Sequence, residues 1–302
     1  MSVDSNPTPS AAAVDTIRAF SRIVTEQVGA LDDRYLAQDR PLGVARVLWE
    51  IGTAGAEVST VRERLNLDSG YLSRILRGLE ADGLVVVVPS PSDQRARRAE
   101  LTELGVAERA ELDGRSDDFA RSVVAPLTES QQDRLVSAMA TVTTLLTAAA
   151  VVLDVVDPEV DAAQYCLRQY FTEINNRFDT GFDPAAALPT EPDSMRAPRG
   201  LFVVATLRGK PVGCGALKFH ADGLAEVKRV WISPDVRGSG LGRRMLTTLE
   251  MHAAEHGATV IHLDSNAALT EAIALYKKSG YTEVEPFNAE PYADFWFEKR
   301  LG

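Results

Sequence analysis

The spacing of apolar side chains changes in kind near the middle of this 302-residue chain. In residues 11–150 they recur every three or four positions, which is the period of a helix with one buried face. In residues 200–300, strand-like alternating runs are separated by helical runs. An acidic stretch, residues 154–159, lies between the two regions. We therefore expect a two-domain α+β protein, with a mostly helical domain over residues 11–152 and an α/β domain over residues 153–302.

Composition limits the classes of function. A content of 45% hydrophobic and 25% charged residues is typical of a soluble globular protein. No apolar stretch is long enough to cross a bilayer, and residues 1–10 lack the features of a signal peptide, so we expect a cytoplasmic protein with no membrane partner. The formal net charge of −11 argues against indiscriminate nucleic-acid binding but permits a local basic face. The two cysteines and four histidines lack metal-ligand spacing, so we expect no metal.

A glycine-rich run, residues 237–242, follows a strand-like stretch (224–234) and opens an amphipathic segment (241–256). Glycine lets the backbone approach an anion, and the free N–H groups of a helix's first turn favour negative charge. Arg237 adds a positive charge. The run therefore predicts a pyrophosphate site, although a plain surface turn before a helix would use the same residue types.

Further along, residues 260–263 predict a strand and residues 270–279 a helix that ends at Gly280. The strand, the R-x-x-G-x-G loop and the later run A-L-Y-K-K-S-G-Y at 274–281 together resemble the GNAT family of acetyl-CoA-dependent N-acetyltransferases. The resemblance implies a mixed central sheet and acetyl-CoA as cosubstrate. It also implies cofactor contacts by the strand residues Val230 and Ile232 and by the loop residues Arg237, Gly238, Ser239, Gly240, Leu241, Gly242 and Arg243. Many members carry an asparagine where this chain has Leu269, and we expect Asn266 to make that contact instead.

Two residues carry the expected chemistry. By resemblance, Tyr276 is the acid that protonates the thiolate of coenzyme A; the alternative is an aromatic side chain packed in the core. Glu226 stands where some members place a general base, and strand alternation puts it on one face with Lys228 and Val230. The alternative for Glu226 is a surface carboxylate paired with Lys228.

Acceptor selection is expected from the helical segment 161–178 and from the C-terminal residues 286–292. Their polar and aromatic side chains could recognise a carboxylate or an amine, and each could equally be a surface residue. The candidates are Glu173, Arg177, Asn288 and Tyr292.

In the first half, residues 59–65 and 68–79 predict two short helices joined by a turn at residues 66–67. Residues 84–88 and 99–102 can pair as strands across an exposed hairpin. This helix, turn, helix and wing resemble the MarR family of winged-helix regulators, whose wing signature D-x-R matches Asp93 and Arg95. The resemblance implies a double-stranded DNA operator, with Asp93 steadying the wing and Arg95 entering the minor groove. The second helix offers Ser69, Tyr71, Ser73, Arg74 and Arg77 to the major groove, and the wing adds Arg97 and Arg98. Alternatively, these arginines only keep the hairpin soluble.

Outer helices complete this half. Ile17, Phe20, Val24, Val28 and Leu31 share one helical stripe, and residues 41–52 predict a second helix. Residues 128–131 have the form of a capping box, and Leu135, Met139, Val142 and Leu146 then repeat at helical steps. That helix either pairs with its mate in a homodimer or faces the core of its own chain.

These observations predict a bifunctional protein, a DNA-binding transcriptional regulator fused to an N-acetyltransferase that acts on a small primary amine. A different class is a regulator whose second domain senses acetyl-CoA or another ligand without turnover. A third reading is an enzyme whose winged helix serves only to dimerise it.

Overall fold

The computed structural model describes residues 10–27, 40–91, 95–178, 181–183 and 191–302. The chain forms two compact units, residues 1–133 and 134–302, which divide within helix α6 (Glu129–Ala149). The fold class predicted from the sequence, α+β in two domains, is confirmed. The boundary predicted between residues 152 and 153 stays a prediction. None of the helices in the described ranges has the length and apolar character needed to cross a membrane.

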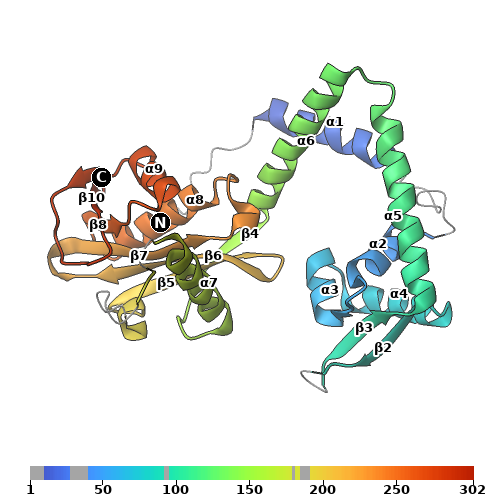
Figure 1. Ribbon diagram of the computed structural model, residues 1–302, viewed down its shortest axis with the longest axis horizontal. Coiled ribbons are helices and arrows are strands. Elements are labelled where there is room, and N and C mark those ends of the chain that lie inside the picture. The colour runs from blue at the N-terminus through green and yellow to red at the C-terminus, as the bar shows by residue number, and fades with distance from the viewer. Residues whose placement is uncertain (1–9, 28–39, 92–94, 179–180, 184–190) are drawn as a thin grey trace. The chain divides into compact units, whose positions relative to one another are not determined.

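The N-terminal unit combines helices with a small antiparallel sheet of strand order β1-β3-β2 (Figure 1). Its elements are α1 (Ala11–Gln27), α2 (Leu42–Ile51), β1 (Ala56–Glu57), α3 (Val58–Leu65), α4 (Ser69–Ala81), β2 (Val85–Pro89), β3 (Arg97–Leu101) and α5 (Glu103–Val124). One core joins the elements from α2 to α5, and Val47, Leu48, Leu79 and Ala99 within it are completely buried. The predicted helix-turn-helix and wing are therefore present.

Local sequence explains the turn between α3 and α4. Helix α3 ends because Asn66 adopts a left-handed conformation, with φ of 50°. Helix α4 begins after Asp68, whose carboxylate accepts hydrogen bonds from the backbone N–H groups of Gly70 (2.9 Å) and Tyr71 (3.0 Å). Leu72 and Leu79 then anchor the apolar face of α4 in the core.

The helices α1 and α6 keep large apolar side chains exposed within the single chain. Ile17 on α1 is 63% exposed, and Met139 and Leu146 on α6 are 49% and 62% exposed. One half of the predicted capping box is present, since the Gln131 side chain accepts a hydrogen bond from the backbone N–H of Thr128 (2.9 Å). The Thr128 hydroxyl donates to the same Gln131 oxygen (3.0 Å). Val28 and Leu31 lie outside the described residues, so the end of the predicted α1 stripe cannot be followed. Pairing of α6 with a second copy stays a prediction.

The C-terminal unit is built on a seven-stranded sheet of order β4-β5-β6-β7-β8-β10-β9. Neighbouring strands are antiparallel except β7 and β8, which are parallel, so the predicted mixed sheet is confirmed. Its elements are β4 (Val151–Val156), α7 (Asp161–Arg177), η2 (Pro192–Met195), β5 (Gly200–Leu207), β6 (Lys210–Phe219), η3 (Ala221–Gly223), β7 (Leu224–Ile232), η4 (Pro234–Val236), α8 (Leu241–Glu255), β8 (Val260–Ser265), α9 (Thr270–Lys278), β9 (Thr282–Val284) and β10 (Phe295–Arg300).

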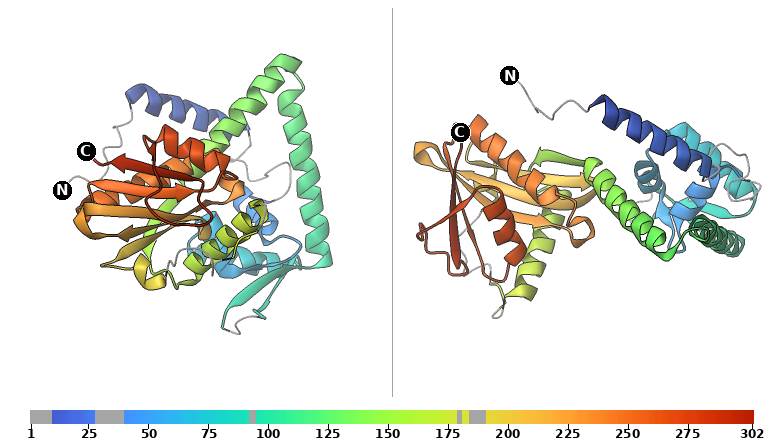
Figure 2. Two further views of the ribbon diagram at one scale, coloured as in Figure 1. Left: turned by 60° about the vertical axis from the view of Figure 1, so that its left-hand side comes forward. Right: turned by 90° about the horizontal axis from the view of Figure 1, so that it is seen from above.

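Helices cover both faces of this sheet (Figure 2). On one face, Leu249 of α8 and Tyr276 of α9 join the core with Val203 and Leu217. On the other face, Ala163 and Cys166 of α7 pack against Phe202 and other side chains of the sheet. Successive residues of β5 thus serve opposite cores, as strand alternation requires.

The acidic stretch at residues 154–159 begins inside a strand. Residues 154–156 belong to β4, which pairs with β5 from Val151 opposite Leu207 to Val156 opposite Phe202. After the strand, Arg196 binds the carboxylates of Asp157 (Nε to Oδ2, 2.8 Å) and Glu159. The acidic residues therefore start within an edge strand and continue into an ion-pair cluster, rather than forming a linker.

Candidate functional site

The two parallel strands separate in the middle of the sheet. Strand β7 pairs with β8 only as far as Glu226 opposite His262, although β7 continues to Ile232 with β6 on its other side. Beyond Glu226, the edge of β7 that faces β8 has no strand partner among the described residues. A cavity of about 480 Å³ lies here, lined by residues of α7, β7, β8, α9, the loop before α8, and the segment that contains Glu290 and Tyr292.

A bulge in β7 changes the face of the sheet toward which its later side chains point. Arg229 has φ of 56°, and the pairing of β6 with β7 shifts between Cys214 and Ala216. Consequently Val230 packs with the core that contains Val227, whereas Glu226 and Lys228 lie on the opposite face. The expectation that Val230 shares a face with Glu226 is therefore wrong, because simple alternation fails at a bulge.

The glycine-rich loop lies at the cavity in a form suited to an anion. Gly238 and Gly240 have φ of 76° and 85°, and a Cβ atom on either would meet no atom within 4 Å. Helix α8 begins after Gly240 with no side-chain cap and no acidic residue in its first turn. Its first N–H groups are therefore available to a ligand. Most of the predicted loop contacts line the cavity, namely Arg237, Gly238, Gly240, Leu241, Gly242 and Arg243.

Ser239 is the exception in the loop. It is absent from the cavity wall, and its hydroxyl donates a hydrogen bond to the backbone oxygen of Val236 (2.7 Å). The strand residues Val230 and Ile232, which are predicted to contact the cofactor, also line the cavity. Asn266 also lines it, but its side chain donates to the backbone oxygen of Tyr292 (2.8 Å) and accepts from the N–H of Ala268 (2.9 Å). Those two bonds occupy the Asn266 amide in shaping the cavity wall.

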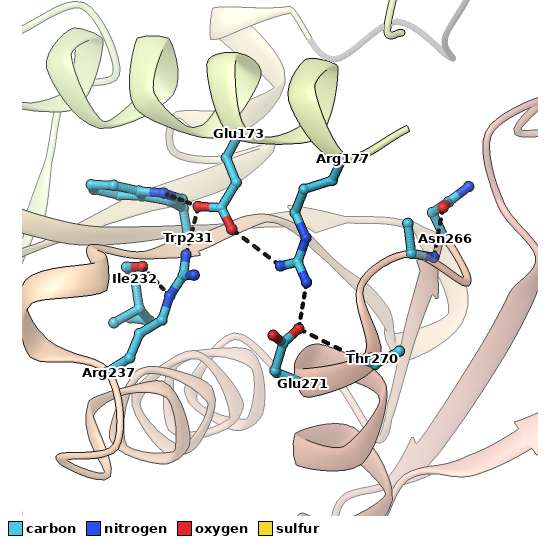
Figure 3. A network of polar contacts seen from close by, with 9 residues as sticks. Glu173, Arg177, Trp231, Ile232, Arg237, Asn266, Thr270 and Glu271 are labelled. Carbon is cyan, nitrogen blue, oxygen red and sulfur yellow. Dashed lines mark hydrogen bonds and ion pairs between the residues drawn. The ribbon is translucent and has the colours of Figure 1, made fainter. Parts of the chain in front are cut away.

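The cation of Arg237 is compensated within the protein (Figure 3). Its Nε donates to the backbone oxygen of Ile232 (2.9 Å), and its Nη2 lies 2.5 Å from Oε2 of Glu173. Glu173 also accepts hydrogen bonds from Trp231 Nε1 (2.9 Å) and from Arg177 (3.2 Å). Glu173, a predicted substrate residue, therefore ties the loop to α7.

Arg177 extends this network to α9. Its Nη2 lies 2.6 Å from Oε2 of Glu271, so the pair bridges two walls of the cavity (Figure 3). The hydrogen bond from Arg177 holds the pKa of Glu271 below its usual value, and the same bond raises the pKa of Arg177. Both side chains are therefore charged at neutral pH.

Tyr276 reaches the cavity from α9 and is only 7% exposed. Its ring lies 6.0 Å from that of Tyr281 and 5.9 Å from that of Phe297, so it also belongs to the core. Burial raises the pKa of Tyr276, and the neighbouring Tyr170 and Asp264 raise it further. The phenol therefore stays protonated at neutral pH, which is the state that a proton donor needs.

Glu226 lies beside the cavity rather than in its wall. Its carboxylate is bound by Lys228 (2.9 Å) and by His220 (3.2 Å). Burial alone would raise the pKa of Glu226, but the charge and hydrogen bond of Lys228, with the bond from His220, lower it below its usual value. This geometry favours the ion-pair alternative, and a role as general base stays a prediction.

Sequence reasoning missed Asp264, one of the carboxylates that line the cavity. Asp264 ends β8 with its side chain 11% exposed, and Lys228 Nζ lies 2.5 Å from its Oδ2. Asn288 Nδ2 donates to the same oxygen (3.1 Å), and Trp296 Nε1 donates to Asn288 (2.8 Å). The predicted substrate residue Asn288 therefore positions Asp264 and does not itself line the cavity. The pair of Lys228 with Asp264 joins two strands far apart in the sequence, so no local pattern predicts it.

Aromatic side chains form the opposite end of the wall. Phe178, Phe182 and Tyr292 line the cavity, and their ring centroids lie 4.9–6.1 Å apart. The hydroxyl of Tyr292 accepts a hydrogen bond from the backbone N–H of Asp183 (3.0 Å). Tyr292, predicted for the acceptor site, is thus a rigid part of an apolar surface.

The candidate DNA-contacting residues of α4 share one exposed face. Arg74 lies with its guanidinium 5.9 Å from the ring centroid of Tyr71, and Arg77 Nε donates to the backbone oxygen of Ser73 (3.2 Å). All the predicted α4 residues, Ser69, Tyr71, Ser73, Arg74 and Arg77, are exposed. Helix α4 thus presents cationic and hydrogen-bonding groups to solvent and its apolar face to the core.

On the wing, Arg95 and Arg97 are exposed, whereas Asp93 lies outside the described residues. Arg98 differs from them, because its Nε bonds Glu100 (3.1 Å) and its Nη2 bonds the backbone oxygen of Ala54. Arg98 therefore anchors β3 within its own unit. Across the described ranges, histidine, cysteine and acidic side chains do not gather in groups that could hold a metal ion.

The C-terminal unit thus has the fold and cleft of a GNAT-type acetyltransferase, and the N-terminal unit is a winged helix-turn-helix. Comparison with known families agrees. Residues 168–281 match the acetyltransferase (GNAT) family and residues 39–96 match the MarR family. The chain therefore joins a segment that matches the MarR family to a segment that matches the GNAT acetyltransferase family.

Individual relatives match the second segment. An IAA acetyltransferase of Azospirillum brasilense is 38% identical over 92 residues, which are 30% of this chain and 59% of that protein. An amino-acid acetyltransferase of Mycobacterium tuberculosis is 32% identical over 88 residues, 28% of this chain and 48% of that protein. The chain spans about half to three fifths of the length of three curated relatives that it matches.

Two solved structures resemble parts of the chain. A putative acyl-CoA N-acyltransferase of Klebsiella pneumoniae is 24% identical, with a TM-score of 0.41, over 51% of this chain and 99% of that one. A probable transcriptional regulator of Pseudomonas aeruginosa is 19% identical, with a TM-score of 0.37, over 43% of this chain and 98% of that one.

Proposed function

We propose that the C-terminal unit transfers an acetyl group from acetyl-CoA to a small primary amine and that the N-terminal unit binds a DNA operator. One observation carries the enzymatic proposal. The unpaired edge of β7, the glycine loop at the start of α8 and the buried phenol of Tyr276 all line one cavity. The first two suit a long ligand with amide and pyrophosphate groups, and the third suits proton donation.

The residues of the cavity fit coenzyme A. Gly238 and Gly240 leave open space where side chains would stand, and the uncapped start of α8 presents N–H groups to the pyrophosphate. The backbone of Val230 and Ile232, on the unpaired edge of β7, would hydrogen-bond the amides of the pantetheine arm. When bound, acetyl-CoA supplies the acetyl group as a thioester.

The transfer forms a bond from the amine nitrogen to the acetyl carbon and breaks the bond from that carbon to sulfur. Tyr276 would give its phenolic proton to the departing thiolate, and the proton lost by the amine returns to solvent or to the phenolate. The low exposure of Tyr276 keeps water from competing for that proton. A backbone N–H on the open edge of β7 would stabilise negative charge on the carbonyl oxygen.

The DNA proposal rests on the exposed face of α4 and on the wing arginines. A two-fold dimer would place two such faces on neighbouring half-sites, and the exposed apolar residues of α1 and α6 support a dimer. Sedimentation velocity tests it, and a monomer at micromolar concentration would contradict it. Since both DNA and acetyl-CoA are met inside the cell, we place the protein in the cytoplasm.

The test of the enzyme is thiol release from acetyl-CoA in the presence of amino acids, polyamines and amine-bearing drugs. Turnover that falls strongly in Tyr276→Phe supports the proposal. Tight binding of acetyl-CoA without turnover of any amine would instead support a regulator that senses acetyl-CoA.

A further inference from the structure

Arg229 is a cation at the cavity wall that differs from Arg177 and Arg237 in what holds it. Arg177 and Arg237 each bind a carboxylate of the protein. Within the part of the chain that the structure describes, Arg229 has no such ion pair. Its guanidinium lies 5.5 Å from the ring centroid of Tyr170 and 5.0 Å from that of Phe171. A guanidinium fixed against two rings and lining a cavity is suited to bind a planar anion such as a carboxylate.

The backbone conformation of Arg229 determines the direction in which its side chain leaves strand β7. Arg229 occupies the left-handed region, which is unfavourable for a residue with a Cβ atom. Its carbonyl oxygen accepts a hydrogen bond from the buried thiol of Cys214 (3.3 Å). The bulge therefore directs two consecutive side chains, Lys228 and Arg229, away from the core that holds Val227 and Val230.

Asp264 supplies the opposite charge in the same cavity. Lys228 and Asn288 both bind its Oδ2, and no described donor binds its Oδ1. Asp264 lines the same cavity as Tyr276, the proposed proton donor, and as Tyr170. Burial raises the pKa of both tyrosines, and the charge of Asp264 raises it further. Arg229 acts on Tyr170 as well and lowers its pKa. The carboxylate of Asp264, the guanidinium of Arg229 and the phenol of Tyr276 thus line one cavity.

An apolar surface accompanies these charges. Phe178 and Tyr292 stack with centroids 5.9 Å apart, and Phe182 lies 4.9 Å from Tyr292. All three rings line the cavity. This surface would favour a ligand with a large apolar or aromatic group.

We propose that the acceptor is an α-amino acid with an aromatic or large apolar side chain. Its ammonium group binds at Oδ1 of Asp264 and loses one proton to solvent before the nitrogen attacks the acetyl carbon. Its carboxylate binds Arg229, and its side chain packs on Phe178, Phe182 and Tyr292. This inference rests on the proposed acetyltransferase function and specifies its substrate class.

The experiment compares phenylalanine with 2-phenylethylamine, which lacks the carboxylate, and with phenylalaninamide, which carries a neutral amide there. In the wild-type protein, kcat/KM for phenylalanine should exceed that for either analogue by about 10–100-fold, as expected for a hydrogen-bonded ion pair. In Arg229→Gln, the ratio of kcat/KM for phenylalanine to kcat/KM for either analogue should fall to within about threefold of unity, since the ion pair is lost. Because both kcat/KM values are measured on the same variant, their ratio is unaffected by any general loss of activity.

Arg208→Gln is the matched control. Arg208 is also an arginine in the left-handed region, with φ of 51°, but it is exposed and absent from the cavity wall. Its substitution should leave the substrate ratio unchanged.

The outcomes separate the two proposals. If the wild-type protein acetylates 2-phenylethylamine at least as efficiently as phenylalanine, the proposed amino-acid acceptor is wrong, whereas the proposed transferase still stands. A preference for phenylalanine that survives in Arg229→Gln overturns the role of Arg229. If no amine of the wider panel is acetylated, the proposed transferase fails and this inference fails with it.

Discussion

At the scale of single residues, burial and neighbouring charge decide which groups of the cavity can take part in proton transfer. The phenol of Tyr276 is buried without a described hydrogen-bond partner, so its pKa rises and it keeps its proton. The carboxylate of Glu226 is buried with two cationic or hydrogen-bonding partners, so its pKa falls and it keeps its charge. A group whose pKa lies far below the working pH is a weak base, whereas a protonated phenol remains a competent acid.

Tyr276→Phe should therefore lower kcat by about 100-fold or more, because it removes only the donating hydroxyl. The affinity for acetyl-CoA, measured by calorimetry, should change by less than about threefold, since no hydrogen bond to the ground state is lost. The control is Tyr281→Phe, another buried tyrosine near the end of α9 that does not line the cavity. An unchanged kcat in Tyr276→Phe would remove this phenol from the mechanism.

Glu226→Gln should change stability rather than the pH dependence of the rate. The folded-state pKa of Glu226 is lowered, so its stabilising contribution is complete above the unfolded pKa of about 4.3 and is lost as pH falls through the folded value. Urea denaturation should show a loss of about 1–3 kcal/mol near neutral pH, and a smaller loss at about pH 4 and below.

The exposed Glu255 provides the control for that measurement, because Glu255→Gln removes the same charge from the surface. If Glu226→Gln instead shifts the acidic limb of the kcat/KM profile, Glu226 is the general base after all.

At the scale of elements, the loop before α8 depends on a conformation that only glycine adopts without strain. Gly240→Ala places a Cβ at φ of 85°, which costs about 1–2 kcal/mol, and the loop relaxes away from the shape that cradles a pyrophosphate. We expect its affinity for acetyl-CoA to fall about tenfold or more, the equivalent of one charge-assisted hydrogen bond.

Gly257→Ala is the matched control for Gly240→Ala. Gly257 has φ of 83° with equally open surroundings and lies outside the cavity wall. Both variants should lose similar stability in thermal unfolding, but only Gly240→Ala should bind acetyl-CoA weakly. Equal affinities in the two variants would contradict the role of this loop.

Elements with strong local signals could be predicted from the sequence. Asp68 caps α4, Pro41 and Gly52 flank α2, and the glycine loop opens α8, all as the local pattern indicates. The strand β4 could not be predicted, because an edge strand with acidic residues reads as a linker until its pairing with β5 is seen.

The residues of the cavity also divide into those that a local sequence pattern predicts and those that it does not. Its glycines, Val230, Ile232 and Tyr276 are proposed from a local motif, and they line the cavity. The bulge at Arg229, the open carboxylate of Asp264 and the contact of Asn288 with it depend on pairings between distant strands. Sequence spacing carries no information on those pairings, which is why alternation misplaced Val230.

At the scale of the whole molecule, a formal charge of −11 means that DNA affinity must come from a local basic surface rather than from the total charge. Arg74→Ala on α4 should therefore weaken operator binding and reduce the slope of log K against log salt by about 0.9, the value for one lost phosphate contact. Arg121→Ala removes the same charge from α5, where Arg121 is 70% exposed and paired with Asp118, and it should leave operator affinity unchanged. Fluorescence anisotropy with a labelled operator at several salt concentrations measures both quantities.

Acetyl transfer should be unaltered in Arg74→Ala, and operator affinity should be unaltered in Tyr276→Phe. Because each substitution changes only one of the two sites, a variant that lost both activities would mean that DNA binding and acetyl transfer are coupled rather than independent.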